Sequence, residues 1–233
     1  MLEVCGINSF YGGAHILHNV SFNVSAGEVV ALLGRNGAGK TTTMKSINGL
    51  VRPRSGRITF AGFETANLPP YRICRLGLGY VPEERRVFSD LTVLENLEVG
   101  RRAAKGDGHA WTVETLFELF PNLAERQHSP GGQLSGGEQQ MLTIARTLMG
   151  NPKMILLDEP SEGIAPVIVE KMAETILELK NTGLTVLISE QNLYFAKLLS
   201  DRAYVIESGE IRYEGSITDL EADPELREKY LAV

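Results

Sequence analysis

The chain has little of what several protein classes require. Among its 233 residues are two cysteines and one tryptophan, and 23 basic side chains are outnumbered by 29 acidic ones, for a formal net charge of −6. Cys5 and Cys74 are too few to build a disulfide framework, which indicates a reducing compartment. Because a dedicated nucleic-acid-binding protein meets the phosphate backbone with clustered Lys and Arg, the acidic balance predicts no nucleic-acid partner.

Long apolar segments are missing as well. The longest clean apolar runs have about five residues, as in Val29–Leu33, whereas a membrane-spanning helix needs roughly 20. The first residues contain no basic stretch followed by an apolar one, so we expect no signal peptide and a cytosolic chain. With 43% hydrophobic and 22% charged residues, the composition is typical of a soluble globular protein. The length predicts one large domain, with or without a subdomain.

Glycine is the one enriched residue type, at 24 of 233 residues, or about 10% against a usual ~7%. Alternation of apolar and polar residues predicts antiparallel strands between residues 4 and 24, and the continuous run Val29–Leu33 predicts a strand buried on both faces. Further strands are expected at residues 57–61, 154–157, 184–189, 204–207 and 211–214. Helical patterns cover about 93–150, with a loop at 103–108, and about 167–181. This layout predicts an α/β core interrupted by a helical insert.

A glycine-rich segment joins the buried strand to a helical pattern. Residues 34–41 fit G-x-x-x-x-G-K-[ST], whose glycines let backbone N–H groups wrap phosphates beside the positive end of a helix. Lys40 would reach the terminal phosphates, and Thr41 would offer its hydroxyl to Mg²⁺. A chance glycine-rich turn is the alternative, but the strand before it and the helix after it favour a nucleotide site. The predicted phosphate-binding residues are Gly34, Arg35, Asn36, Gly37, Ala38, Gly39, Lys40, Thr41 and Thr42.

A pair of carboxylates follows the apolar run at 154–157. Asp158 would hold Mg²⁺ through water, and Glu159 would polarise the attacking water as a general base. Adjacent residues of a strand point to opposite faces, so the two carboxylates need not crowd one ion. An apolar run ending in Asp-Glu is a weak signal by itself, but together with the glycine-rich segment it predicts nucleotide hydrolysis.

Two further glycines precede the helical pattern that begins near residue 141. In the sequence Leu-Ser-Gly-Gly-Glu-Gln-Gln at 134–140, Ser135 and Glu138 fit a capping box. The same segment fits a second phosphate-binding helix end, with Ser135 as a side-chain donor. Both interpretations remain open, but a capping box does not explain two glycines in the first turn.

The three motifs in this order resemble the ATP-binding subunits of ABC transporters, and the resemblance covers nearly the whole chain. It implies an α/β P-loop NTPase fold: a RecA-like core with an antiparallel β subdomain over about 1–92 and 151–233, and a helical subdomain over about 93–150. It implies ATP hydrolysis with Mg²⁺, in which Lys40 and Glu159 are catalytic. It also implies a head-to-tail dimer in which one subunit completes the ATP site of the other with Ser135, Gly136, Gly137 and Glu138.

Smaller features follow from position within this resemblance. Tyr11 is placed where the family has an aromatic residue that stacks on adenine, and an ordinary strand aromatic is the alternative. Glu83 replaces a usual Gln and would bind Mg²⁺ or its water, unless it is an exposed loop residue. Gln191 replaces a catalytic switch His and would donate to the γ-phosphate without becoming a cation, whereas a register slip would place Glu190 there. Ala165 replaces a usual Asp.

These departures together resemble one subgroup, the second ATPase subunit of branched-chain amino-acid importers. The carrying motifs are Pro-Glu-x-Arg-Arg-x-Phe at 82–88, Ser-x-Gly-Ile-Ala-Pro at 161–166 and Glu-Gln-Asn at 190–192. Relatives of the subgroup serve urea, short amides and some aromatic acids.

The subgroup implies a second ATPase subunit, permease subunits, a periplasmic solute-binding protein and a place at the cytoplasmic face of the cell membrane. Arg85 and Arg86 are expected to be solvated or to contact the permease. A small-molecule kinase and a soluble ABC protein of DNA repair or translation are the alternatives. The Ser-Gly-Gly helix start disfavours the kinase, and the single compact cassette disfavours the soluble protein.

Overall fold

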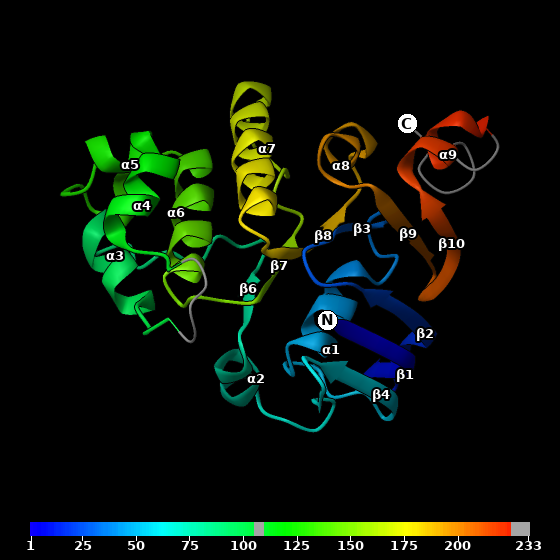
Figure 1. The fold of residues 1–233 in the computed structure, drawn as a ribbon. Helices are drawn as coiled ribbons and strands as arrows, with labels where there is room; N and C mark the ends of the chain where they lie inside the picture. Colours follow the sequence, from blue (N-terminus) through cyan, green and yellow to red (C-terminus); the bar gives the residue numbers. More distant parts are fainter. Residues whose placement is uncertain (105–109, 225–233) are drawn as a thin grey trace.

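The computed structural model describes residues 1–104 and 110–224 (Figure 1). Its described strands form two sheets, an antiparallel one in the order β2-β1-β4-β5 and a mixed one in the order β10-β9-β3-β8-β7-β6. In the mixed sheet, neighbours from β9 to β6 are parallel and β10 is antiparallel to β9. The strands are β1 (Leu2–Tyr11), β2 (Ala14–Val24), β3 (Val29–Leu33), β4 (Ser55–Phe60), β5 (Phe63–Glu64), β6 (Leu78–Val81), β7 (Met154–Asp158), β8 (Thr185–Glu190), β9 (Arg202–Glu207) and β10 (Glu210–Ser216).

Strand β3 shows why its sequence is apolar without interruption. Val29, Ala31 and Leu33 face a core cluster that also contains side chains of the helices between residues 136 and 199. Val30 and Leu32 face a second cluster, shared with β1, β2 and β4 of the antiparallel sheet. All five side chains are buried because both faces of the strand are covered, which is the pattern of a central parallel strand.

The helices divide into a group around the sheets and a separate group beside them. Helix α1 packs between the two sheets, against β1, β2, β7 and β8. In Figure 1, α3, α4, α5 and α6 lie together on one side of the molecule, and α7 lies between that group and the mixed sheet. The described helices are α1 (Lys40–Ile47), α2 (Pro70–Leu76), α3 (Val93–Gly100), α4 (Val113–Leu119), α5 (Pro121–Glu125), α6 (Gly136–Leu148), α7 (Pro166–Asn181), α8 (Leu193–Leu199) and α9 (Ile217–Ala222).

The predicted α/β fold class is confirmed, with an antiparallel sheet and a helical group added to a parallel core. Helices α3–α6 fall within 93–150, the stretch in which the sequence predicts the helical subdomain. Residues 105–108 of the loop expected at 103–108 lie outside the described residues. The pattern analysis did not predict β5, β6, α2, α8 or α9, which are all seven residues or shorter.

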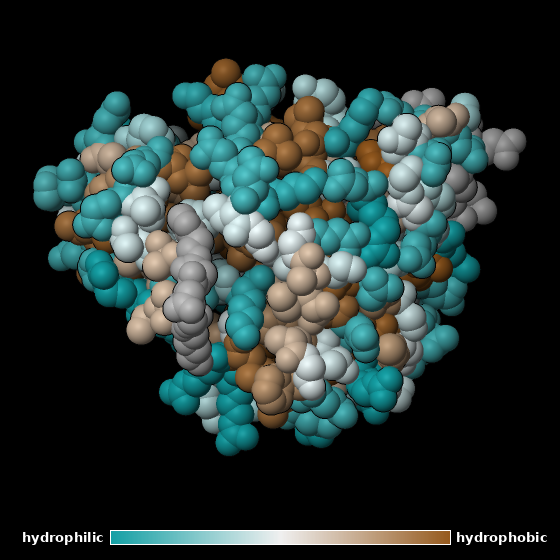
Figure 2. Space-filling view, in the orientation of Figure 1, coloured by the Kyte–Doolittle hydropathy of each residue, from teal (hydrophilic) through white to brown (hydrophobic). Residues whose placement is uncertain are grey.

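The surface is mostly hydrophilic on the face shown in Figure 2, with apolar residues gathered where α7 and α8 lie in Figure 1. The exposed large apolar side chains on these helices include Val167 and Leu177 of α7 and Leu198 of α8. A search of the described helices finds none that is both long enough and apolar enough to span a bilayer.

Candidate nucleotide site

The loop between β3 and α1 contains two glycines, Gly34 and Gly39, at positions with no room for a side chain. A Cβ on Gly34 would collide with the backbone oxygen of Ile206, and one on Gly39 would lie 2.9 Å from the Leu17 Cδ2 atom. Gly39 also has φ 115, a left-handed conformation that suits glycine. It is the N-cap of α1, and no side chain caps the helix, so the first amides of α1 remain available to an anion.

Lys40, the first residue of α1, folds back over this loop. Its Nζ donates to the carbonyl oxygens of Gly34 at 2.7 Å and Arg35 at 3.0 Å. It also forms an ion pair with Glu159 Oε1 at 3.1 Å, and the two side chains are only 2% and 7% exposed. The ammonium group therefore joins the glycine-rich loop to the residue that follows β7.

Asp158, the last residue of β7, accepts three hydroxyl hydrogen bonds. Its Oδ1 accepts from Ser189 at 2.7 Å and from Thr41 at 3.1 Å, and its Oδ2 accepts from Tyr80 at 3.0 Å. Burial raises the pKa of Asp158 above its ordinary value, and the three hydroxyl donors offset part of that rise. The structure thus brings Thr41 and Asp158, two of the three predicted Mg²⁺ ligands, from distant motifs into direct contact.

The donor set at this point suits a hard cation that keeps most of its own ligands. Mg²⁺ takes oxygen ligands and is commonly held by one or two protein groups plus phosphates and water. The hydroxyl of Thr41 and the carboxylate of Asp158 are such groups. Within residues 1–104 and 110–224, no cluster of three or more His, Cys, Asp or Glu side chains is placed to hold a metal by itself.

Glu159 lies at the centre of a group of carboxylates. Its backbone has φ 46, an uncommon conformation for a residue with a side chain, and its amide donates to the Ser189 backbone and hydroxyl oxygens, both at 3.1 Å. Hydrogen bonding to the Glu159 carboxylate, together with burial, raises the pKa of Glu162 to about 7. Burial and then the charges of Glu159 and Asp158 raise the pKa of Glu83, which places that exposed side chain within electrostatic reach of both.

The end of β8 separates the two candidates for the switch position. Gln191 is exposed just beyond the strand, whereas Glu190 is 1% exposed. The Glu190 carboxylate accepts from the backbone amides of Ser161 at 3.1 Å and Asn192 at 3.4 Å. Its backbone oxygen accepts from the amide of Gly34 at 3.2 Å, so the end of β8 borders the glycine-rich loop. Of the two residues, Gln191 is the one whose side chain remains accessible to a ligand.

Tyr11 ends β1 and is 48% exposed. The hairpin that contains it lies beside the glycine-rich loop, because Leu17 of β2 faces Gly39 and the amide of His18 donates to the Gly209 oxygen at 2.8 Å. The amide of Gly209 in turn donates to the oxygen of Ala38, also at 2.8 Å. An exposed aromatic ring on this hairpin is available to stack on a base.

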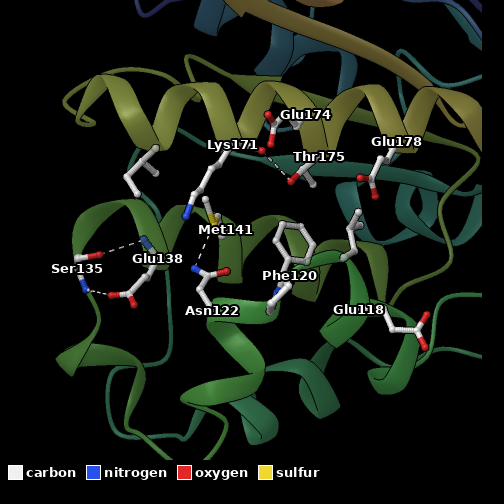
Figure 3. A pocket seen from close by; sticks show the side chains of 13 residues that line it. Glu118, Phe120, Asn122, Ser135, Glu138, Met141, Lys171, Glu174, Thr175 and Glu178 are labelled. Carbon is white, nitrogen blue, oxygen red and sulfur yellow. Dashed lines mark hydrogen bonds between the residues drawn. The ribbon is translucent and has the colours of Figure 1, made fainter.

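The Ser-Gly-Gly turn forms the capping box that the sequence allows. The Glu138 amide donates to Ser135 Oγ at 3.3 Å, and the Ser135 amide donates to Glu138 Oε2 at 2.8 Å (Figure 3). The two glycines have a separate reason, since a Cβ on Gly136 would meet the guanidinium of Arg85 and one on Gly137 would lie 2.6 Å from Ile168 Cγ2. Packing against Ile168 therefore requires Gly137, whereas a side chain at Gly136 would have to displace the Arg85 guanidinium.

This turn opens onto a groove between the helical group and α7. The groove has a volume of about 490 Å³, and its walls carry Glu118, Glu174 and Glu178 as well as Lys171 (Figure 3). In Figure 1, α6 lies in the helical group while α1 lies between the sheets. The structure thus gathers Lys40, Thr41, Asp158 and Glu159 at one place and holds Ser135–Glu138 apart from them.

Several residues of this site were not found by sequence analysis. Tyr80 and Ser189 donate to Asp158 from β6 and β8, and Glu162 is next to Glu159. No sequence spacing joins Tyr80 and Ser189 to Asp158, because strand pairing in the sheet brings them together, whereas Glu162 lies three residues after Glu159 in the same segment. Arg85 is half-buried and donates to the backbone oxygens of residues 162 and 163, a contact that the sequence did not predict, whereas Arg86 is exposed.

Comparison with known proteins identifies a family. A family model described as "ABC transporter" matches residues 17–162. The chain is 44% identical to the high-affinity branched-chain amino acid transport ATP-binding protein BraG of Pseudomonas aeruginosa, over 99% of both chains. It is 35% identical to the probable branched-chain amino acid transport ATP-binding protein LivF of Archaeoglobus fulgidus, over 94% of both. It is also 37% identical to the lipopolysaccharide export system ATP-binding protein LptB of Haemophilus influenzae, over 95% of this chain and 92% of that one.

Solved structures agree with this result. The ADP conformation of an ATP-binding cassette of an ABC transporter superposes with a TM-score of 0.83 at 30% identity, over 98% of this chain and 97% of that chain. A dimeric ATP-binding cassette in a post-hydrolysis state, bound to ADP and phosphate, superposes with a TM-score of 0.80 at 25% identity, over 93% and 99% of the two chains.

Proposed function

Because the chain belongs to the ABC transporter family as an ATP-hydrolysing subunit, we propose that it powers an importer of branched-chain amino acids. Two of the relatives above carry that substrate in their names, and one matches the chain over 99% of its length. The subgroup motifs at 82–88, 161–166 and 190–192 support the same assignment. An importer of urea, short amides or aromatic acids is the second candidate.

The observation that carries the proposed mechanism is the hydrogen bond of 3.1 Å from Thr41 to Asp158, which joins the glycine-rich loop to the end of β7. Tyr11 stacks on adenine, and residues 34–42 with Lys40 hold the phosphates. Mg²⁺ neutralises phosphate charge when bound, and Thr41, Asp158 and Glu83 are the residues that hold it or its water. Glu159 takes a proton from the attacking water. Gln191 donates a hydrogen bond to the γ-phosphate.

A complete site needs a second subunit in this mechanism. Ser135, Gly136, Gly137 and Glu138 lie in the helical group, apart from the residues that hold the phosphates (Figure 1). We infer that they close on the ATP of a partner, with amides of the α6 N-terminus and the Ser135 hydroxyl as donors. A second ATPase subunit, permease subunits and, indirectly, a periplasmic solute-binding protein are the proposed partners, with the chain held peripherally at the cytoplasmic face of the membrane.

Light scattering of Glu159→Gln tests the two-subunit site. Without the general base the variant retains ATP, and turnover is expected to fall by roughly 10²–10⁴. If two copies complete both sites, Mg-ATP doubles the 25.5 kDa mass. A monomer that binds ATP indicates a different ATPase subunit as the partner, and a variant that neither binds nor pairs contradicts the proposed site. Glu159→Gln with Lys40→Ala is the matched control, since it lacks the phosphate contact.

Uptake by cells tests the proposed solute. Deleting the chain's coding sequence in its source cells should abolish high-affinity leucine uptake, and wild type but not Lys40→Ala should restore it. Normal leucine uptake together with lost uptake of urea or a short amide would support the second candidate instead.

A further inference from the structure

Arg85 lies where three segments of the chain meet. Its guanidinium Nη2 donates to the carbonyl oxygens of Glu162 at 3.1 Å and Gly163 at 3.3 Å. The same guanidinium lies against Gly136, where a Cβ would collide with Nη1. Its own carbonyl oxygen accepts from the Thr143 hydroxyl at 2.6 Å, which fixes the residue to α6. One side chain thus joins the loop after β6, the segment after Glu159 and the first turn of α6.

The backbone at Arg85 is held in an unfavourable conformation. Its φ is 57, in the left-handed region that a residue with a side chain rarely adopts. Nothing in its own turn requires a side chain there, and glycine would adopt this φ readily. The contacts made by the guanidinium and the carbonyl oxygen are what maintain the conformation, which indicates that the position of this side chain matters.

A continuous set of contacts connects Arg85 to the phosphate-binding residues. Lys40 forms an ion pair with Glu159, and the amide of Glu162 donates to the Glu159 oxygen at 3.1 Å. The carbonyl of Glu162 then accepts from Arg85, which touches Gly136. A bound phosphate that draws Lys40 away from Glu159 would break the ion pair at one end of this series of contacts. The Ser-Gly-Gly turn lies at the other end.

We propose that Arg85 is a positioning residue that couples nucleotide binding in a chain's own site to the placement of the Ser135–Glu138 turn that the chain offers to its partner. This inference rests on the proposed function, since it assumes that residues 34–42 bind nucleotide and that the turn acts on a second subunit. The planar guanidinium is suited to the task because it donates to two neighbouring carbonyls in a fixed geometry, which a lysine ammonium does not reproduce.

Hydrogen–deuterium exchange on the monomer tests the coupling without requiring a partner. The probe is Mg²⁺ with the non-hydrolysable analogue β,γ-imido-ATP, at a protein concentration at which light scattering shows a monomer. Two segments are followed, 34–44 for nucleotide binding and 134–141 for the turn. In the parent, both are expected to exchange more slowly with the nucleotide. In Arg85→Ala, slowing at 34–44 is expected to persist and slowing at 134–141 to be lost.

Arg86→Ala is the matched control, because Arg86 is the adjacent arginine and its exposed guanidinium pairs only with Glu84 among the contacts described. It should behave as the parent does. Arg85→Lys, which keeps the positive charge, should retain part of the response. The melting temperatures of all variants would reveal a folding defect.

The outcomes separate the two hypotheses. Slowing at 134–141 in Arg85→Ala equal to that of the parent would overturn the coupling, as would a parent in which 34–44 responds and 134–141 does not. A parent in which 34–44 does not respond would instead contradict the proposed nucleotide site.

Discussion

The buried carboxyl group of Glu190 gives the protein a pH-dependent stability that one substitution should remove. Glu190 is 1% exposed at the end of β8, and its carboxylate accepts backbone hydrogen bonds from Ser161 and Asn192. Burial raises the pKa of Glu190 from 4.5 to about 7, because the hydrogen bonds from Ser161 and Asn192 only partly offset the lost water and the nearby negative charge of Glu159 raises the pKa further. Replacing Glu190 with Gln keeps the shape and removes the titration.

The sign and size of the effect follow from the two pKa values. Between pH 4.5 and about 7, the unfolded chain releases a proton that the folded chain keeps, so the free energy of unfolding falls as the pH rises. Above pH 7 both states are ionised and the loss is complete. The full difference corresponds to about 3 kcal/mol. The free energy of unfolding of Glu190→Gln, measured relative to that of wild type, should therefore rise by about 2–3 kcal/mol between pH 5 and pH 8.

Urea unfolding of wild type and Glu190→Gln at pH 5 to 8 measures this difference directly. Subtracting the two curves cancels the contributions of all other titrating groups. Glu178→Gln, which removes an exposed carboxylate of α7, controls for the change in net charge and should show no such slope. Parallel wild-type and Glu190→Gln curves across the range would refute the account of a buried, proton-retaining Glu190.

Three further substitutions test other contacts. Lys40→Ala removes the ammonium proposed to hold the phosphates and should weaken ATP binding by roughly 10-fold to 100-fold, which is the scale of a charged hydrogen bond. An ATP affinity near that of wild type, measured by calorimetry, would contradict the assignment. Tyr80→Phe removes the donor to Asp158 Oδ2, and the Mg²⁺ concentration that half-saturates ATP binding should rise by about tenfold; an unchanged Mg²⁺ titration would make Tyr80 irrelevant to the metal. Arg202→Lys breaks a two-pronged contact with Glu28, at 2.8 and 3.0 Å, and should cost about 1–2 kcal/mol of unfolding free energy in urea, whereas Arg212→Lys on the same surface should cost less.

The sequence was sufficient for elements with a strong local pattern. The continuous apolar run at 29–33 became β3 with the same bounds, because burial on both faces leaves an unbroken signal. The predicted helix at about 167–181 became α7, Pro166–Asn181. The glycine-rich loop was also predictable, since its residues are adjacent in the chain and its chemistry depends on their spacing.

Features that depend on tertiary contacts were not predictable. Strand β6 has four residues, one of them Gly79, and exists because it pairs with β7. Only that pairing brings Tyr80 to Asp158. A capping box does not explain the two glycines of the Ser-Gly-Gly turn, but packing within the chain gives them a further reason, since a Cβ on Gly137 would meet Ile168 and one on Gly136 would displace Arg85. Sequence proximity gave no indication of either contact.

The ion pair between Lys40 and Glu159 bears on how hydrolysis is restricted to bound ATP. The Glu159 Oε1 atom lies 3.1 Å from the buried Lys40 ammonium, so this oxygen is engaged in an ion pair rather than directed at a water molecule. In the proposed mechanism, phosphate oxygens replace Glu159 as the partner of Lys40, which returns the carboxylate to a state in which it can accept a proton from water. The φ of 46 at Glu159 keeps the side chain in place through this exchange, since the backbone amide stays bonded to Ser189. Lys40 would then bind the phosphates and, by leaving the ion pair, free Glu159 to act as the base. Lys40→Ala should therefore lose both the phosphate contact and the control that this ion pair exerts on Glu159.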